Sequence, residues 1–254
     1  MKKIYNLVFI VGSLLFTLNS CKVDNFPLPD AQVYGAIRDS IGGGLVETDA
    51  NSTTGSLIGV YELGKYEANP LRRTWLIKPS GEYRNNLVYS NAYRFDFTSC
   101  NFFPITLNQT IKSGENKLDF TIVPFIRIKN LSITYDAAGN KINASFTLEG
   151  GRPSVKVSRV TLYAWTDMYV GDNVKKTMTT GTGTPTRSYT GAAQTINPAT
   201  VITLSIDLAA NQTTDKNGFG VHRNYYFRVG ALATGPTGVG TIKVNYAPYV
   251  VIAL

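Results

Sequence analysis

Few residues of this sequence could act as acids, bases, nucleophiles or metal ligands. One histidine, His222, and two cysteines, Cys21 and Cys100, occur in 254 residues. Zinc sites and Cys–His nucleophiles need several such side chains at defined spacings, and no G-x-S-x-G turn presents a serine. The 17 acidic residues are scattered, whereas glycoside hydrolysis requires two opposed carboxyl groups. We therefore expect no catalytic residue, no metal site, no cofactor and no enzymatic activity.

Aromatic residues are better candidates for a binding site. A sugar ring presents a flat face of C–H groups that can stack on Trp or Tyr, while nearby polar side chains bind its hydroxyls. A core position is the alternative for each of them, because one face of any strand in a folded domain must be buried. The glycan-binding candidates are Trp75, which follows Arg72 and Arg73, and Tyr66, Tyr83, Trp165 and Tyr169.

The chain is basic, with 25 Lys and Arg against 17 Asp and Glu and a formal net charge of +8. Beyond the first residues, the basic doublets are Arg72-Arg73 and Lys175-Lys176, and no nucleic-acid recognition motif accompanies them. The positive charge could attract an anionic envelope surface or an acidic glycan, or it could be an ordinary solvated charge distribution. We expect no nucleic-acid partner.

Residues 1–20 have the pattern of a secretory signal peptide. The basic start Met1–Lys3 precedes an apolar run from Ile4 to Leu18, which is shorter than the roughly 20 residues of a membrane-spanning helix. The run ends in Leu18-Asn19-Ser20-Cys21, which resembles the lipobox of bacterial lipoproteins. That resemblance implies that Cys21 becomes the lipidated N-terminus and anchors the protein to a membrane. An ordinary cleavage site beside a cysteine is the alternative.

Lys22-Val23-Asp24 resembles the export tag of Bacteroidetes lipoproteins that reach the outer face of the cell, with a plain linker as the alternative. We therefore expect an outer-membrane protein, lipid-anchored and at the cell surface. Lipidation of Cys21 would leave Cys100 as the one thiol. Its aromatic neighbours, Phe97, Phe102 and Phe103, favour a buried and inert cysteine over a reactive one.

The body of the chain predicts an all-β protein. It is 43% apolar and 17% charged, with 23 Gly and 11 Pro, which is typical of a folded chain rather than a disordered one. Short runs of β-branched and aromatic residues alternate with Gly, Asn, Asp and Pro clusters, and no long helical period is present. Residues 143–148 alternate in the manner of a half-buried antiparallel strand.

The length indicates two domains. After a lipidated tether at 21–32, we place the first domain at 33–124 and the second at 125–254. The second contains about seven predicted strands, as in immunoglobulin or fibronectin III sandwiches, and its lack of a Cys…Trp…Cys pattern favours the fibronectin-like form. Residues 114–117 are predicted as a turn before a strand at 118–123. Residues 177–198, rich in Thr and Gly, are predicted as a long exposed loop.

Several segments of the first domain resemble those of carboxypeptidase regulatory-like, or transthyretin-like (prealbumin-like), sandwiches. They are Tyr34–Asp39 with the glycines at 42–44, Pro79–Tyr83, Asn91–Phe95, and Ile111–Asn116 followed by Asp119–Pro124, which is similar to the closing hairpin.

With the lipobox and a second sandwich, the whole chain resembles a family of two-domain Bacteroidetes lipoproteins of unknown function. Similar proteins are encoded beside SusC/SusD-type glycan importers. The resemblance implies a non-catalytic role in polysaccharide uptake, as a glycan-binding or accessory component, with a polysaccharide and SusC/SusD-like proteins as partners. A structural or adhesive module that contacts other envelope proteins is the alternative.

Overall fold

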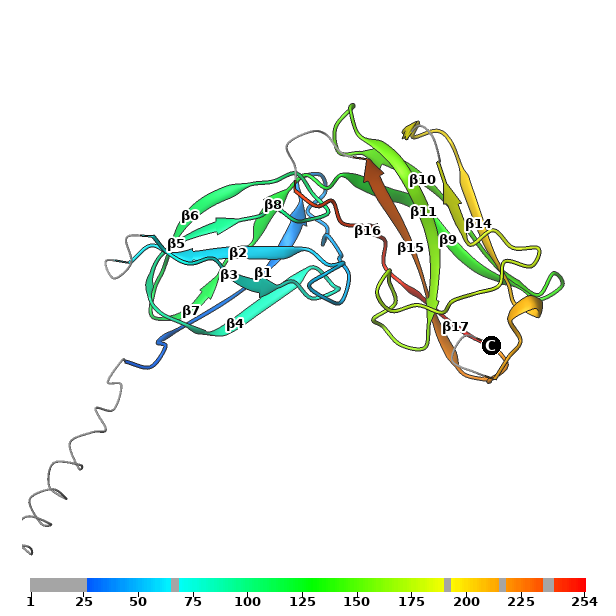
Figure 1. The fold of residues 1–254 in the computed structure, drawn as a ribbon, viewed down its shortest axis with the longest axis horizontal. Helices are drawn as coiled ribbons and strands as arrows, with labels where there is room; N and C mark the ends of the chain where they lie inside the picture. Colours follow the sequence, from blue (N-terminus) through cyan, green and yellow to red (C-terminus); the bar gives the residue numbers. More distant parts are fainter. Residues whose placement is uncertain (1–26, 65–68, 190–192, 215–217, 235–239) are drawn as a thin grey trace, which may run out of the picture.

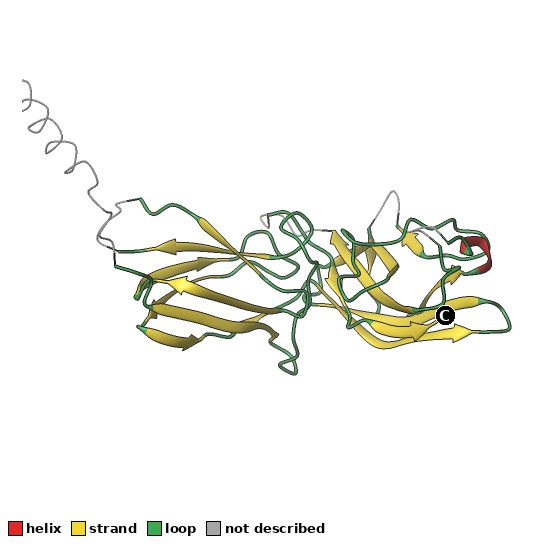
Figure 2. Cartoon of the chain, turned by 90° about the horizontal axis from the view of Figure 1, so that it is seen from below, coloured by secondary structure: helices red, strands yellow, loops and turns green. Residues whose placement is uncertain are grey.

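The computed structural model describes residues 27–64, 69–189, 193–214, 218–234 and 240–254. In these ranges the chain forms two β-sandwiches that lie end to end (Figure 1, Figure 2), with one 3-10 turn, η1 (Ala209–Asn211), and no α-helix. The predicted all-β fold is therefore confirmed. No helix in the described part of the chain has the length and apolarity to cross a membrane. The predicted signal peptide and Cys21 lie outside the described residues.

The N-terminal sandwich is built from two sheets. The first has the order β4-β1-β7, with β8 also paired to β1, and the second has the order β3-β2-β5-β6. The strands of the first sheet are β1 (Ala31–Asp39), β4 (Glu82–Val88), β7 (Gly114–Lys117) and β8 (Phe120–Ile122). Those of the second are β2 (Leu57–Glu62), β3 (Arg73–Leu76), β5 (Asn91–Asp96) and β6 (Thr106–Ile111).

The core of the N-terminal sandwich is aromatic. Phe95 of β5 lies 5.4 Å from Phe120 of β8 between ring centroids, and Phe97 lies 4.8 Å from Phe120. Alternate residues of β2 and β5 enter this core because successive strand side chains point to opposite faces. Position 35 in β1 must be glycine because the backbone of Leu118 passes close to it: a Cβ there would lie 1.9 Å from the Leu118 carbonyl oxygen.

The C-terminal sandwich also has two sheets, in the orders β14-β10-β9 and β12-β11-β15-β16; β13 also pairs with β11, and β17 with β15. The first sheet contains β9 (Ile126–Asp136), β10 (Lys141–Gly150) and β14 (Ile202–Asp207). The second contains β11 (Lys156–Trp165), β12 (Thr186–Ser188), β13 (Gln194–Thr195), β15 (Asn224–Thr234), β16 (Asn245–Tyr246) and β17 (Val250–Ala253).

Three local predictions need correction. β1 begins at Ala31, inside the predicted tether. Residues 114–117 form strand β7, which pairs in parallel with β1, and not a turn. The predicted closing hairpin is instead a crossover, because β6 and β7 belong to different sheets. The sequence pattern did not predict this crossover because the chain passes from β6 to β7 in only the two residues between Ile111 and Gly114. Gly114 allows the tight turn with a φ of 88°.

The predicted long loop at 177–198 also carries structure. β12 and β13 lie within it and pair with β11, so the segment covers an edge of the second C-terminal sheet. These strands have only three and two residues, all exposed, which explains why no hydrophobic pattern marked them. The prediction for Cys100 is confirmed: the residue is buried, and burial raises the pKa of its thiol to about 12.

A buried polar interface joins the two sandwiches. The last strand of the first is β8 and the first strand of the second is β9, with residues 123–125 between them. Asn101 is fully buried and donates to the carbonyl of Glu47 at 2.7 Å and to that of Val244 at 3.1 Å. Asn245 of β16 donates in turn to the Asn101 carbonyl at 2.7 Å. The segment around β16 is therefore bonded directly to the N-terminal sandwich (Figure 1).

Candidate functional site

A hollow of about 290 Å³ lies on the outer face of the sheet β14-β10-β9. Its floor consists of residues that alternate with the core. Ile142, Ala144 and Phe146 of β10 point into the sandwich and are buried, so Asn143 and Ser145 point outward. We call this hollow the groove; its lining residues are Ser132, Thr134, Asn143, Ala144, Ser145, Thr184, Arg187, Thr203, Leu204 and Ser205.

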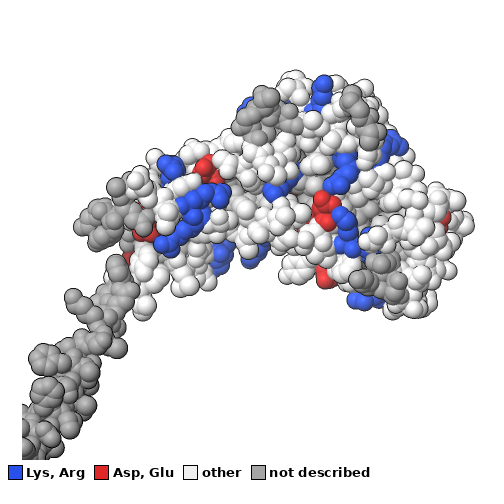
Figure 3. Space-filling model, viewed as in Figure 1, with Lys and Arg blue, Asp and Glu red and all other residues white. Residues whose placement is uncertain are grey.

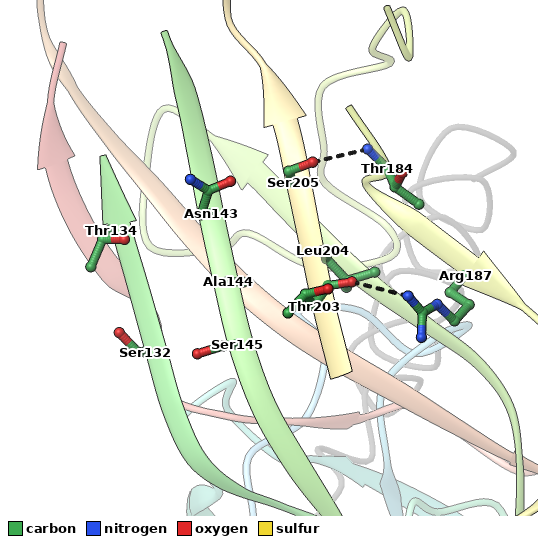
Figure 4. Close-up of a pocket in the computed structure, with 10 residues that line it drawn as sticks. All are labelled: Ser132, Thr134, Asn143, Ala144, Ser145, Thr184, Arg187, Thr203, Leu204 and Ser205. Carbon is green, nitrogen blue, oxygen red and sulfur yellow. Dashed lines mark hydrogen bonds between the residues drawn. The ribbon is translucent and has the colours of Figure 1, made fainter. Parts of the chain in front are cut away.

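The strand register arranges the floor in two rows of polar side chains. In one row, Asn143 of β10 is paired with Thr134 of β9 and Ser205 of β14. In the other, Ser145 is paired with Ser132 and Thr203 in the same two strands. Figure 4 shows both rows crossing the three strands. Directly paired residues lie about 5 Å apart across a sheet, so each row spans three strands at close spacing.

The segment before and within β12 forms one wall of the groove. The backbone N–H of Thr184 donates to Ser205 Oγ at 3.1 Å, and the Ser205 N–H donates to the Thr184 carbonyl at 3.0 Å. Arg187 donates to the Thr203 carbonyl at 3.5 Å and is otherwise exposed (Figure 4). The wall therefore places a guanidinium at the edge of the polar rows.

Asp207 at the end of β14 holds this wall in place. Its Oδ2 accepts from the N–H and the hydroxyl of Thr182 at 2.9 and 2.7 Å, and its Oδ1 accepts from the N–H of Ala210 at 3.0 Å. These hydrogen bonds lower the pKa of Asp207 to about 2, those from Thr182 most strongly. The carboxylate is thus charged at neutral pH and positions the turn that leads to Thr184.

A smaller hollow of about 60 Å³ adjoins the groove through a shared residue, Arg187. Tyr189 lines this second hollow and is half-buried against the C-terminal core. An aromatic side chain is therefore available beside the polar rows.

The groove can exchange hydrogen bonds but offers no general acid or base. Hydroxyls and the Asn143 amide each donate and accept, and Arg187 only donates. The lining contains no carboxylate, histidine or cysteine. Across the described residues, no group of three or more His, Cys, Asp and Glu side chains could hold a metal ion. The arrangement fits reversible binding of a neutral, hydroxyl-rich ligand.

The structure disagrees with one predicted aromatic platform and does not describe another. Tyr83 is buried, donates its hydroxyl to the Leu118 carbonyl at 2.5 Å and stacks on Phe120 at 5.7 Å. Burial raises the pKa of Tyr83 far above its ordinary value. Its ring presents no face to a ligand, and the prediction for Tyr83 is wrong. Tyr66 lies outside the described residues.

Trp75 is half-buried, with its ring 5.7 Å from that of Phe95 in an edge-on contact and 6.4 Å from that of Tyr83. Most of this side chain therefore packs in the core, which was the alternative to a sugar-binding role. Its neighbours on the strand, Thr74 and Leu76, are the exposed residues.

Trp165 and Tyr169 differ from each other. Trp165 is half-buried in β11 and is paired with Tyr226 of β15, whose ring lies 5.2 Å from that of Tyr249. Tyr169 is 48% exposed in the loop that follows β11. Both remain candidates, but Trp165 lies on the sheet opposite the groove and Tyr169 in the loop that follows it.

Sequence reasoning did not select the groove residues. Asn143 and Ser145 were within reach, because the alternation at 143–148 already indicates which side chains point outward. Arg187 and Thr184 were not, since they come from a segment predicted as a loop and enter the groove only through tertiary pairing.

The chain matches one family model and several solved structures. A family model described as a domain of unknown function, DUF3823_C, matches residues 126–250, which is nearly all of the C-terminal sandwich. The crystal structure of a Bacteroides uniformis protein, named as a candidate carbohydrate-binding protein, is 41% identical, with a TM-score of 0.79 over 89% of this chain and 100% of that one. No curated protein matches the chain.

More distant crystal structures share the fold. A DUF3823 family protein from Parabacteroides merdae is 18% identical, with a TM-score of 0.65 over 89% of this chain and 100% of its own. One from Bacteroides ovatus is also 18% identical, with a TM-score of 0.63 over 89% and 99% of the two chains. By its family match and its similarity to the Bacteroides uniformis protein, this chain belongs to the DUF3823 family.

Proposed function

We propose that this protein binds carbohydrate without catalysis and that the groove on β9, β10 and β14 receives the sugar. The observation that carries the proposal is the pair of polar rows, Thr134–Asn143–Ser205 and Ser132–Ser145–Thr203, which point into one hollow. A sugar presents hydroxyls that donate and accept in several directions, and Ser, Thr and Asn do the same. The volume is at the lower end for small-molecule sites, which suits a short segment of a glycan.

Two further features support a saccharide as ligand. Arg187 adds charge-bearing donors at the groove edge, and Tyr189 adds a ring in the adjoining hollow. The 41% identical Bacteroides uniformis protein is named as a candidate carbohydrate-binding protein. That name describes the relative, and its extension to this chain is part of the proposal.

We also propose a location and a role. The lipobox-like sequence that ends in Cys21 supports a lipid anchor, and the following Lys22-Val23-Asp24 supports exposure at the cell surface. A surface glycan-binding lipoprotein would serve a SusC/SusD-like polysaccharide uptake system. Radiolabelled palmitate should be incorporated into the full-length protein and not into the Cys21→Ala variant.

The test of the groove is binding to a panel of neutral and charged polysaccharides by affinity gel electrophoresis. It uses residues 22–254, which contain every described element. A glycan that retards the wild-type protein should lose about tenfold or more in affinity for the double variant Asn143→Ala/Arg187→Ala, since each substitution removes direct hydrogen bonds. The matched control is Asn86→Ala/Arg84→Ala, the same residue types on the N-terminal sandwich, where Arg84 donates to Asn86 at 2.6 Å.

Equal affinity of the groove variant and the control would refute the groove as the site. A wild-type protein that binds no glycan in the panel would refute carbohydrate binding itself.

A further inference from the structure

Two arginines lie against the outer face of the N-terminal sheet β3-β2-β5-β6. Arg94 of β5 is paired with Tyr61 of β2, and its guanidinium carbon is 4.1 Å from the centre of the Tyr61 ring. At this distance the cation is stacked on the aromatic face. Arg72, just before β3, reaches over Gly59 of β2. We call the surface formed by Arg72, Arg94, Gly59 and Tyr61 the arginine face.

Gly59 makes room for Arg72. A Cβ at position 59 would lie 2.6 Å from Arg72 Nε and 2.9 Å from Nη2, so the guanidinium occupies the space of a missing side chain. Arg72 Nη1 also donates to the Thr74 hydroxyl at 3.3 Å. The two contacts hold the guanidinium near the sheet surface.

The two guanidinium groups lie over residues of the same strand. Gly59 and Tyr61 are two residues apart on one strand and therefore share its outer face, about 7 Å apart along the strand. Figure 3 shows Lys and Arg atoms gathered over the part of the N-terminal sandwich where β2, β3 and β5 lie in Figure 1.

Neither arginine has an ionic partner within the described residues. Arg38, Arg84, Arg127, Arg159 and Arg228 each form an ion pair there. Asp96 lies opposite Gly59 in β5, but its carboxylate accepts from the Thr106 hydroxyl at 3.2 Å and is not paired with an arginine. Arg72 and Arg94 can therefore direct donors to a group from solution.

We infer that the arginine face binds a carboxylate or sulfate group carried by a saccharide. Guanidinium groups present paired donors that match the two oxygens of such groups. Thr74, Thr106 and Asn108 are exposed on the same sheet and can bind adjacent hydroxyls. The inference rests on the proposed carbohydrate function for the saccharide part and adds an acidic substituent and a second site. A phospholipid surface fits less well, because membrane-binding patches gather about 4–8 basic residues.

The test compares three polymers with residues 22–254: polygalacturonate for carboxylate, dextran sulfate for sulfate ester and dextran as the uncharged reference. Retardation by one or both acidic polymers is expected, weakening as salt is added. Arg72→Ala/Arg94→Ala should lower the affinity by about tenfold or more. Arg72→Lys/Arg94→Lys keeps the charge but not the paired donors, and should lose most of the same affinity.

The control Arg84→Ala/Lys117→Ala removes the same charge from the other sheet of the same sandwich. Arg84 also lies over a tyrosine, Tyr34, at 5.3 Å, but it is paired with Glu115. This control should bind acidic polymers within about twofold of the wild type.

Equal losses in the control and the Arg72/Arg94 variant would show a general charge effect and overturn the inference. So would full affinity in the lysine variant, or no binding of either acidic polymer. Loss of acidic-polymer binding in Asn143→Ala/Arg187→Ala alone would also overturn it, while leaving the groove proposal intact. Phosphatidylglycerol vesicles that bind the wild type while both acidic polymers fail would assign the face to a membrane and contradict the inference.

Discussion

Arg228 of β15 donates to the carboxylate of Glu47 at 2.5 Å, across the interface between the two sandwiches and 181 residues away in sequence. Arg228 is 1% exposed, and it also donates to the carbonyls of Ala247, Thr48 and Val170 at 3.0, 3.2 and 3.2 Å. One guanidinium thus satisfies acceptors from both sandwiches. Such a junction should hold them in a fixed relation.

Arg228→Ala should destabilise the protein by about 3–5 kcal/mol, because it leaves a partly buried carboxylate and several buried carbonyls without a donor. Burial already raises the pKa of Glu47, against the opposing effect of Arg228. Urea unfolding followed by tryptophan fluorescence would measure the change. Arg223→Ala, an exposed arginine just before the same strand, should change the unfolding free energy by less than about 0.5 kcal/mol. Comparable effects of the two variants would contradict the structural role of Arg228.

A second ion pair across the interface predicts acid sensitivity. Arg127 of β9 binds both carboxylate oxygens of Asp39 in β1, at 2.5 and 2.6 Å. Burial alone would raise the pKa of Asp39, but hydrogen bonds from Arg127 and from the Ile41 N–H outweigh it and lower the pKa below its ordinary value.

A carboxyl group with a lowered pKa in the folded state stabilises the protein above its unfolded pKa, and this stability is lost as the pH falls through the folded value. The melting temperature should therefore decrease as the pH is lowered below about 4. The Asp39→Asn variant should be less stable at pH 7 and should lose less on acidification. An unchanged slope of melting temperature against pH in this variant would count against the prediction.

Trp75 should behave as a core residue. Its ring packs on Phe95 and Tyr83, so Trp75→Ala should cost about 2–3 kcal/mol of unfolding free energy, less than a fully buried Trp. The purified folded variant should bind glycans as the wild type does. A variant with full stability and lost binding would restore Trp75 as a sugar platform.

Asp207 should control the order of the groove wall. Asp207→Asn replaces a charged acceptor of the Thr182 N–H by a neutral amide. Hydrogen exchange at Thr182 and Thr184 should become faster at pH 7, with unchanged exchange in β11. Asp136→Asn is the control, since Asp136 accepts from Gly139 in the turn between β9 and β10. Equal protection of Thr182 in all three proteins would refute the role of Asp207.

Much of the fold could be predicted because it depends on local pattern. Residues 143–148 alternate and lie within β10, and Gly42 and Gly43 adopt positive φ angles in a turn, as their type favours. The stacked sheets also follow from many short strands. The division at Pro124 stays a prediction about domains, since the interface around Arg228 and Asn101 joins the two sandwiches closely.

The site was harder to predict because it depends on which strands become neighbours. Tyr83 and Trp75 are of the residue types that stack on sugars, and only their packing shows that Tyr83 is buried and Trp75 half-buried. Conversely, Ser145 and Thr203 are ordinary surface residues until pairing of β10 and β14 places them in one row. Arg187 belongs to a three-residue strand without any apolar signal.

The most direct test is calorimetric titration of one neutral glycan, the one that retards the wild-type protein most in affinity gels. It is titrated into the wild-type protein and into a variant whose groove is blocked. Ser145→Trp places a large side chain on the outward face of β10 and should abolish binding while leaving the melting temperature near that of the wild type. Thr110→Trp, outward on β6 of the other sandwich, should bind normally. Binding by Ser145→Trp with wild-type affinity would contradict the assignment of carbohydrate binding to this groove.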